Sequence, residues 1–335
     1  MKRILIDRHH AGLFYSLQLL GARLDWEVWT PVGHGWWDEG YWAFGRDSYQ
    51  DGRLRDQYLT IDEAWTFAPK GMFGYMTFDP EFPQVPIFGI DLDTARSMEW
   101  DYVMATVQEN QHGLARFARE HGARYLYQVG NTGQQIDWGL YPTCLVSSEM
   151  PIEGVGIRYH QEMDPAFRWY VPLETRVISS FINFATHNTC WPLAPQLWSH
   201  LPEHEWLLYG GGMPDGVVKP AALIAEKMAA SGWAYHDKPT GDGFGHVLWG
   251  WAAVGRPLIG HASHYDGKLG EVLWEDGVTC IDLDRHDIEE AADLIIAISD
   301  DEERHEEMCR AIRAAFDAHY DPERDARAIA QLLGA

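Results

Sequence analysis

The sequence predicts an α/β protein built from two domains, each with a parallel sheet flanked by helices, whose sheets face one another across a cleft. At 335 residues the chain is about twice as long as a typical domain. In both halves, short apolar runs alternate with stretches whose apolar residues recur at helical spacing, which is the pattern of a parallel sheet covered by helices. In such open sheets, ligands bind at the carboxyl ends of the strands.

The first half begins with an apolar run at Lys2–Ile6 that ends at Asp7, which predicts a strand followed by a loop and a helix. The segment from Trp36 to Gly89 is rich in Trp, Tyr, Phe, Gly and Pro and predicts a long aromatic insertion without assignable elements. The elements expected in this half are strands at 2–6, 26–30, 102–107 and 124–129 and helices at 12–20 and 114–121.

The segment from Tyr159 to Pro172 has no apolar period and predicts a connector between domains. We therefore expect domains at residues 1–172 and 173–320, and a C-terminal helix in 321–335 that can cross back to the first domain. Ser299 and Glu302 have the spacing of a capping box and predict a helix start. The elements expected in this half are strands at 177–182, 206–209, 233–235, 258–259 and 279–283 and helices at 193–200, 217–231, 244–254, 287–298 and 326–333.

The charge balance and the cysteines exclude several classes of function. Twenty-six basic against 50 acidic residues give a net charge of −24, and the basic residues form no cluster, which disfavours nucleic acid as a partner. The four cysteines form no CxxC pair, which argues against a disulfide framework and against structural zinc. The N-terminus lacks the apolar core of an export signal, and no stretch is apolar enough to span a membrane, so we expect a cytoplasmic protein.

The most informative stretch is the glycine-rich segment from Gly241 to His246, which precedes an apolar helical pattern up to Val254. Glycines at positions 241, 243 and 245 let backbone N–H groups approach a ligand closely, and a helix start presents unpaired N–H donors with a partial positive charge. This arrangement suits a diphosphate. The alternative is a glycine turn that only packs a strand against a helix.

The stretch from Asp242 to Pro257 resembles the acidic-GFG segment, helix and G-x-P turn of GT-B glycosyltransferases, especially the retaining type that uses nucleotide-sugar donors. Trp206–Gly212 is similar to that family's strand and glycine turn, and Glu271–Gly277 is similar to its acidic E-x-x-E-D-G segment with one extra residue. The resemblance covers Val177 to Leu333. It implies two Rossmann-like domains in a GT-B arrangement, with a nucleotide sugar, UDP- or GDP-linked, held mainly by the second domain.

The resemblance also implies which residues bind the donor. Asp242 would contact hydroxyls of the donor sugar, and the turn Gly243, Phe244 and Gly245 would lie beside the diphosphate. Gly250 stands where the family has a second acidic residue for the ribose, and the family's Arg and Lys pair is missing from the loop after the first strand of the second domain. The candidates for the missing phosphate contacts are His187, Asn188, Lys238 and Lys268, and His246 and Glu271 complete the expected donor-binding set.

The chemistry asks mainly for stabilisation of the leaving group. When the bond between the anomeric carbon and phosphate breaks, charge develops on the diphosphate, and preorganised donors at a helix start stabilise it without a metal. An inverting reaction needs a base across the cleft, and the first loop offers Asp7, His9 and His10, of which His10 is the predicted base. A retaining reaction needs no such base, and the two histidines are then ordinary loop residues.

The acceptor site is expected in the first domain, where aromatic residues crowd the sequence GHGWWDEGYW. Aromatic planes suit the apolar faces of sugars, and carboxylates accept hydrogen bonds from hydroxyls. The residues predicted to bind the acceptor are His9, Gly12, Trp36, Trp37 and Asp38. The alternative is that the tryptophans fill the core of the insertion.

Two Asp-Leu-Asp patterns, Asp91–Asp93 and Asp282–Asp284, have the carboxylate pairs that hold a divalent cation on a diphosphate in other enzymes. A local role explains both patterns better. Asp93 is expected to cap the helix that begins at Ala95, and Asp284 to lie between a strand and the helix that follows. No metal ligands and no cofactor are therefore predicted.

Together these features predict a metal-independent glycosyltransferase of the hexosyltransferase type, which moves a sugar from a nucleotide-sugar donor to a hydroxyl of a glycan or a small aglycone. A nucleotide-sugar epimerase of the same fold is one alternative. A glycosyltransferase acting on modified DNA bases is another, although it would need a basic rim that the sequence lacks. Gly250 and the missing basic pair favour a third, a sugar-nucleotide binding protein without catalysis.

Overall fold

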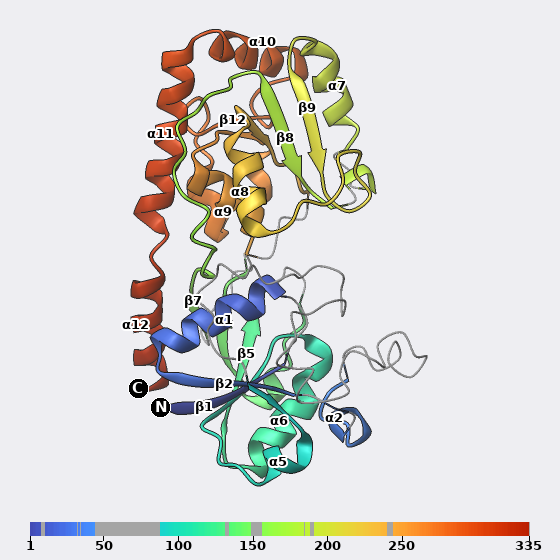
Figure 1. Cartoon of the computed structure of the whole chain (residues 1–335), viewed down its shortest axis with the longest axis vertical. Helices are drawn as coiled ribbons and strands as arrows, with labels where there is room; N and C mark the ends of the chain where they lie inside the picture. The colour runs from blue at the N-terminus through green and yellow to red at the C-terminus, as the bar shows by residue number, and fades with distance from the viewer. Residues whose placement is uncertain are drawn as a thin grey trace. The chain divides into compact units, whose positions relative to one another are not determined.

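The computed structural model describes residues 1–7, 11–31, 33, 35–43, 88–130, 134–148, 156–183, 185–187, 191–239 and 244–334. The chain folds into two units, Met1–Glu162 with Pro322–Ala335 and Met163–Asp321 (Figure 1). Along the chain, the first unit ends at Glu162 and the second begins at Met163. This boundary lies inside the connector predicted between Tyr159 and Pro172 and before the division expected at residue 173.

The first unit contains a seven-stranded parallel sheet in the order β3-β2-β1-β4-β5-β6-β7. Its strands are β1 (Lys2–Ile6), β2 (Trp26–Pro31), β3 (Phe88–Ile90), β4 (Tyr102–Ala105), β5 (Arg124–Val129), β6 (Thr143–Val146) and β7 (Gly156–Arg158). Alternate residues of β1 enter different cores, Ile4 and Ile6 on one face and Leu5 on the other, as the strand pleat requires. The strand order reverses between β1 and β4, and open sheets bind ligands at such reversals.

Helices cover both faces of this sheet. They are α1 (Ala11–Arg23), α2 (Gly35–Asp38), α5 (Leu92–Arg96), α6 (Gln111–Glu120) and α12 (Pro322–Leu333), with short 3-10 turns η2 (Gln108–Asn110) and η3 (Trp138–Leu140). The C-terminal helix α12 packs against α1 and β7 (Figure 1). Its Ile329 is buried in the same core as Leu13 and Leu17, and its Asp325 accepts a hydrogen bond from the backbone N–H of His160. The end of the chain is therefore part of the first unit.

The second unit contains a separate five-stranded parallel sheet in the order β12-β11-β10-β8-β9. Its strands are β8 (Val177–Phe181), β9 (Glu205–Tyr209), β10 (Trp233–Tyr235), β11 (Leu258–Gly260) and β12 (Cys280–Asp282). Its helices are α7 (Leu193–His200), α8 (Ala221–Ala229), α9 (His246–Val254), α10 (Ile288–Ser299) and α11 (Glu302–His319), with 3-10 turns η4 (Ala185–His187), η5 (Ala262–Tyr265) and η6 (Leu269–Leu273). The strand order reverses between β8 and β10.

The prediction of an α/β protein with two parallel sheets is confirmed, whereas several predicted helix starts are corrected. The helix expected from Val217 begins at Ala221, because Pro220 precedes it and a proline ring inside a helix clashes with the preceding turn. The capping box expected at Ser299 and Glu302 is wrong. Ser299 ends α10, and Asp301 caps α11 by accepting a hydrogen bond from the N–H of Arg304.

The β3, β6 and β7 strands were not predicted, because three- or four-residue segments carry too little pattern. Most of the aromatic insertion, residues 44–87, lies outside the described residues. Among the described helices, none has both the length and the hydropathy that crossing a bilayer requires.

Candidate functional site

Polar side chains gather where β10 and β11 end in the second unit. Asp237 follows β10 by two residues, His261 follows β11 directly, and His264 lies in the turn η5. Because β10 and β11 are parallel neighbours, their carboxyl ends meet at the same edge of the sheet, next to the reversal of strand order. The fold thus joins in space three residues that belong to two separate loops.

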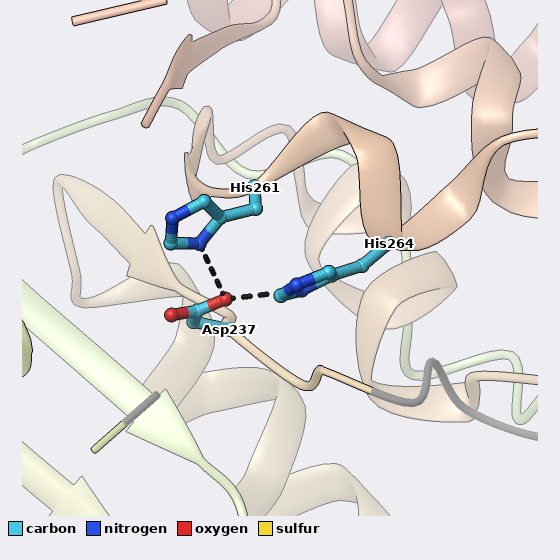
Figure 2. A group of neighbouring side chains, drawn as sticks. All are labelled: Asp237, His261 and His264. Carbon is cyan, nitrogen blue, oxygen red and sulfur yellow. Dashed lines mark hydrogen bonds and ion pairs between the residues drawn. The ribbon is translucent and has the colours of Figure 1, made fainter. Parts of the chain in front are cut away.

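Asp237 is the centre of this group, with both imidazoles turned toward its carboxylate (Figure 2). Its side chain is buried, and Oδ1 lies 2.9 Å from Nδ1 of His261 and 3.2 Å from Nδ1 of His264. The other oxygen, Oδ2, accepts a hydrogen bond from the hydroxyl of Tyr235 at 3.4 Å. The two histidines are each about one-sixth exposed, so the group lies just below the surface.

The electrostatics of the group follow from these contacts. Burial by itself raises the pKa of Asp237, but the contacts with His261 and His264 outweigh burial and bring the pKa to about 2. The hydrogen bond to Asp237 raises the pKa of His261 above its usual value, against the opposing effect of burial. Asp237 is therefore a carboxylate at neutral pH, and it favours the charged form of His261.

Two further carboxylates hold the turn that carries the histidines. Asp282 accepts a hydrogen bond from the N–H of Ala262 at 3.1 Å, and Asp284 accepts one from the N–H of Ser263 at 2.8 Å. The second Asp-Leu-Asp pattern therefore holds a neighbouring loop in place. Its first aspartate, Asp282, ends β12, and Asp284 lies between β12 and α10.

In the first Asp-Leu-Asp pattern, Asp91 and not Asp93 caps the helix. Asp91 accepts hydrogen bonds from the N–H and the hydroxyl of Thr94, whereas the side chain of Asp93 is 96% exposed. The helix begins at Leu92, three residues before the predicted Ala95, and the cap therefore falls on the first aspartate of the pattern.

The glycine-rich turn leads into α9. Gly241, Asp242 and Gly243 lie outside the described residues. Gly245 has a φ of 74°, a left-handed conformation that glycine adopts without steric cost, and α9 starts at His246. Phe244 is buried, with its ring stacked on Trp249 at 5.9 Å and edge-on to His246 at 5.0 Å. The described part of the turn is thus anchored by an aromatic side chain while the helix start follows it.

Gly250 lies on a buried face of α9. A Cβ at this position would lie 3.1 Å from Cε1 of Phe167 and 3.4 Å from Sδ of Met228. The position that holds an acidic residue in the resembled family is therefore packed against apolar side chains, and a carboxylate there would be buried among them.

The other predicted donor residues lie on neighbouring loops. Lys268 comes directly before η6, with its ammonium 5.4 Å from the ring centre of Tyr265, and Glu271 accepts a hydrogen bond from the N–H of Gly267. The turn η6 packs against both α9 and η5, so these two residues belong to the same region as the helix start. Lys238 follows Asp237 directly, while the side chain of His187, at the end of η4, and all of Asn188 lie outside the described residues.

In the first unit, the predicted acceptor residues separate into buried and exposed members. Trp36 and Trp37 are almost fully buried in the core, and the indole N–H of Trp36 donates to the carbonyl of Ile90. This placement favours the alternative in which the tryptophans fill a core. Asp38 is exposed at the end of α2, and Gly12 lies in the first turn of α1.

His9 and His10 lie outside the described residues, whereas Asp7, which precedes their loop, lies within them. Asp7 is buried at the end of β1, with its two oxygens accepting hydrogen bonds from the N–H of Thr106 and from Nδ2 of Asn110, both at 2.6 Å. Burial raises its pKa to about 6, in spite of these hydrogen bonds. Because Thr106 follows β4, the contact bridges the two strands at which the order reverses.

The group formed by Asp237, His261 and His264 was not predicted from the sequence. A signal was present, since Asp237 and His261 each follow an apolar run that was predicted as a strand, and His261 and His264 are three residues apart. The sequence did not show that the loops after β10 and β11 lie next to each other, because sequence spacing alone does not indicate which strands are neighbours in a sheet.

No protein-family model matches the sequence, and no curated protein sequence matches it. Solved structures match its fold. HepE from Anabaena, in complex with UDP-glucose, has a TM-score of 0.64 at 12% sequence identity, and the match covers 100% of both chains. Sucrose-phosphate synthase from Thermosynechococcus elongatus has a TM-score of 0.60 at 12% identity, over 99% of this chain and 98% of that chain.

An alpha-glucosyltransferase in complex with UDP and a 13-mer DNA containing a HMU base also matches, with a TM-score of 0.60 at 10% identity over 100% of both chains. These matches are GT-B glycosyltransferases, and each likeness extends over both sheets of this chain. The chain therefore has the GT-B fold, which confirms the fold that the resemblance in its second half predicted.

Proposed function

We propose that this chain is a glycosyltransferase that moves a sugar from a nucleotide-sugar donor to an acceptor hydroxyl. The observation that carries the proposal is the full-length likeness to structures that hold UDP-glucose or UDP. The second unit supports it, because Gly245, whose backbone is left-handed, directly precedes α9. This helix start lies beside the strand ends at which open sheets bind ligands.

In the proposed reaction, the bond between the anomeric carbon and the phosphate oxygen breaks and its electron pair goes to the diphosphate. The N–H groups at the start of α9 would stabilise this charge, with Gly243, Phe244 and Gly245 beside it and Asp242 on the sugar hydroxyls. The acceptor oxygen bonds to the anomeric carbon and loses its proton. In an inverting reaction His10 would take that proton.

The remaining donor contacts are proposed for residues on the loops around the same helix start. His246 begins α9, and Lys268 and Glu271 lie at η6, which packs against α9. Lys238 and His187 would add positive charge or hydrogen bonds to the phosphates. We expect the donor to be UDP- or GDP-linked and its sugar to be a hexose.

For the acceptor we propose a glycan or a small aglycone. A net charge of −24 repels a polyanion, so the DNA held by one of the matched enzymes is disfavoured here. Among the predicted acceptor contacts, Asp38 is exposed at the end of α2. The expected cytoplasmic location and a reaction that needs no metal remain predictions, and the second is tested by adding EDTA to the assay.

Thermal unfolding with UDP-, GDP-, ADP- and TDP-sugars tests the donor site. A donor at 100 times its dissociation constant should stabilise the protein by about 2.7 kcal/mol. Nucleotide release should then require an added acceptor. Release without an acceptor would indicate hydrolysis or epimerisation, a shift without release would indicate a binding protein, and no shift with any donor would contradict the proposal.

A matched pair of variants separates catalysis from folding. Asp242→Asn should lower turnover at least 100-fold, or about 2.7 kcal/mol in the barrier, without an equal loss of stability. Asp293→Asn makes the same chemical change at an exposed position of α10 and should leave turnover unchanged. Equal losses of stability and turnover in Asp242→Asn would mean that the glycine turn is only structural.

A further inference from the structure

The group Asp237, His261 and His264 has the composition of a metal site. Each residue offers one ligand atom, and these atoms all lie within 4.8 Å of one another. We infer that the three side chains bind a divalent transition-metal ion at the strand ends of the second unit. This inference goes beyond the proposed transfer reaction and departs from the sequence-based expectation that the chain holds no metal.

The distances fit an ion with little rearrangement. In a tetrahedral site with metal–ligand distances near 2.0–2.1 Å, neighbouring ligand atoms are about 3.3 Å apart. Oδ1 of Asp237 lies 2.9 Å from Nδ1 of His261 and 3.2 Å from Nδ1 of His264. With respect to the carboxylate, the two nitrogens therefore need to move by only a few tenths of an ångström, and all the ligand atoms of the group lie within 4.8 Å of one another.

Hydrogen bonds among the described residues do not give every buried polar atom of this group a partner. His261 donates from Nδ1 to Asp237, but the buried Nδ1 of His264 has no hydrogen-bond partner within the described part of the chain, although it is at ion-pair distance from the same oxygen. Buried polar nitrogens are rarely left in this state. A metal ion between the three atoms would coordinate both nitrogens and the carboxylate, with the remaining imidazole protons on Nε2.

The surroundings hold the ligands and favour a cation. The carboxylates of Asp282 and Asp284 bind the backbone N–H groups of Ala262 and Ser263, the two residues between the histidines. Tyr235 contacts the second oxygen of Asp237. Hydrogen bonds of this kind orient the ligands of known metal sites, and the extra negative charges add electrostatic attraction for a cation.

The donor set indicates the class of metal. Two imidazoles and one carboxylate suit Zn²⁺ and the neighbouring ions Co²⁺, Fe²⁺ and Mn²⁺ better than Mg²⁺ or Ca²⁺, which prefer oxygen ligands. Three protein ligands leave at least one coordination position open, as in sites that bind water or a substrate. That position lies at the sheet edge where open α/β folds bind anionic ligands.

The test uses the untagged full-length chain, freed of metal by EDTA and then freed of EDTA, without any nucleotide. We expect Co²⁺ to bind one equivalent with a visible absorption band that Zn²⁺ abolishes, and Zn²⁺ to raise the unfolding temperature. His261→Gln and His264→Gln should each weaken Co²⁺ binding at least 100-fold. Asp284→Asn, which removes a nearby negative charge and alters the support of the turn but removes no ligand, should weaken it about 10-fold.

A second histidine of the same unit supplies the matched control. His286 lies beside two carboxylates, with its Nε2 3.0 Å from Oδ2 of Asp276 and its Nδ1 4.0 Å from Oε2 of Glu290. His286→Gln therefore removes an imidazole outside the three-ligand group and should leave Co²⁺ binding unchanged. Absence of the Co²⁺ band, or a band that survives in both ligand variants, would overturn the inference.

If the ligand variants fail to fold, X-ray absorption of the Zn²⁺-loaded parent protein can still identify the metal ligands. Two imidazoles and an oxygen ligand near 2.0 Å are expected. A spectrum without imidazole ligands, or with sulfur, would also overturn the inference. None of these measurements uses a sugar donor. Metal binding can therefore be refuted while the proposed transfer activity stands, and the transfer activity can be refuted while metal binding stands.

Discussion

Asp7 in the first unit and Asp237 in the second are both buried at the carboxyl ends of parallel strands, next to the point where strand order reverses. Their pKa values move in opposite directions. Asp7 accepts from a backbone N–H and an amide, and burial raises its pKa to about 6. Asp237 is also desolvated, but its histidine partners lower its pKa to about 2. The neutral donors around Asp7 do not offset the cost of burying the charge, whereas the two imidazoles beside Asp237 do.

We expect the largest effect from replacing Asp237 by alanine, which tests whether this residue stabilises the second unit. In Asp237→Ala, the mostly buried imidazoles of His261 and His264 lose the carboxylate that both of them face. We expect the free energy of unfolding to fall by about 3 kcal/mol in urea denaturation at neutral pH. Asp293→Ala, at an exposed position on α10, should change it by less than about 0.5 kcal/mol. A loss from Asp237→Ala no larger than that of the control would remove the contrast between the two aspartates.

The pH dependence of Asp7 tests the first unit. Its folded pKa of about 6 lies above the unfolded value of 3.8, so its contribution is fully present below pH 3.8 and is lost as the pH rises through 6. Relative to Asp7→Asn, the free energy of unfolding of the parent protein should therefore fall by up to about 3 kcal/mol between pH 4 and 7. Urea denaturation across this range measures the difference, and a constant difference would contradict a raised pKa.

The same experiment on Asp237, in EDTA, should give the opposite sign. Its folded pKa of about 2 lies below the unfolded 3.8, so its contribution is present above pH 3.8 and is lost as the pH falls through 2. Relative to Asp237→Asn, the parent protein should lose about 2 kcal/mol between pH 5 and 2. If the two aspartates changed stability in the same direction with pH, the comparison would fail.

The smallest expected effects come from aspartates that accept only local hydrogen bonds near the surface. Asp91 caps α5 in the first unit, and Asp287 forms a capping box with Glu290 at the start of α10 in the second. Replacing either by alanine should cost about 1 kcal/mol in thermal or urea unfolding. A cost near 3 kcal/mol in either variant would show that strand-end burial is not what distinguishes Asp7 and Asp237.

Most of the fold was predictable because its signals are local. The strands Lys2–Ile6 and Arg124–Val129 and the helix Leu193–His200 have the bounds that the sequence predicted. The helix start predicted at Val217 was wrong, because the apolar residues have helical spacing from there on, whereas Pro220 keeps the backbone from becoming helical until Ala221. Of the glycine turn predicted before α9, Gly245 lies within the described residues, and it adopts the left-handed conformation that glycine favours.

The sequence by itself determined the two α/β halves, the parallel sheets and the glycine turn, since apolar spacing, proline and glycine act over a few residues. Only the tertiary structure decided that Trp36 and Trp37 are buried and that Asp237 meets a histidine 24 residues further along the chain. It also decided the opposite pKa shifts of Asp7 and Asp237. The physical reason is that strand neighbours and desolvation are set by the whole sheet, and the charge of a buried carboxyl depends on the partners that the sheet places beside it.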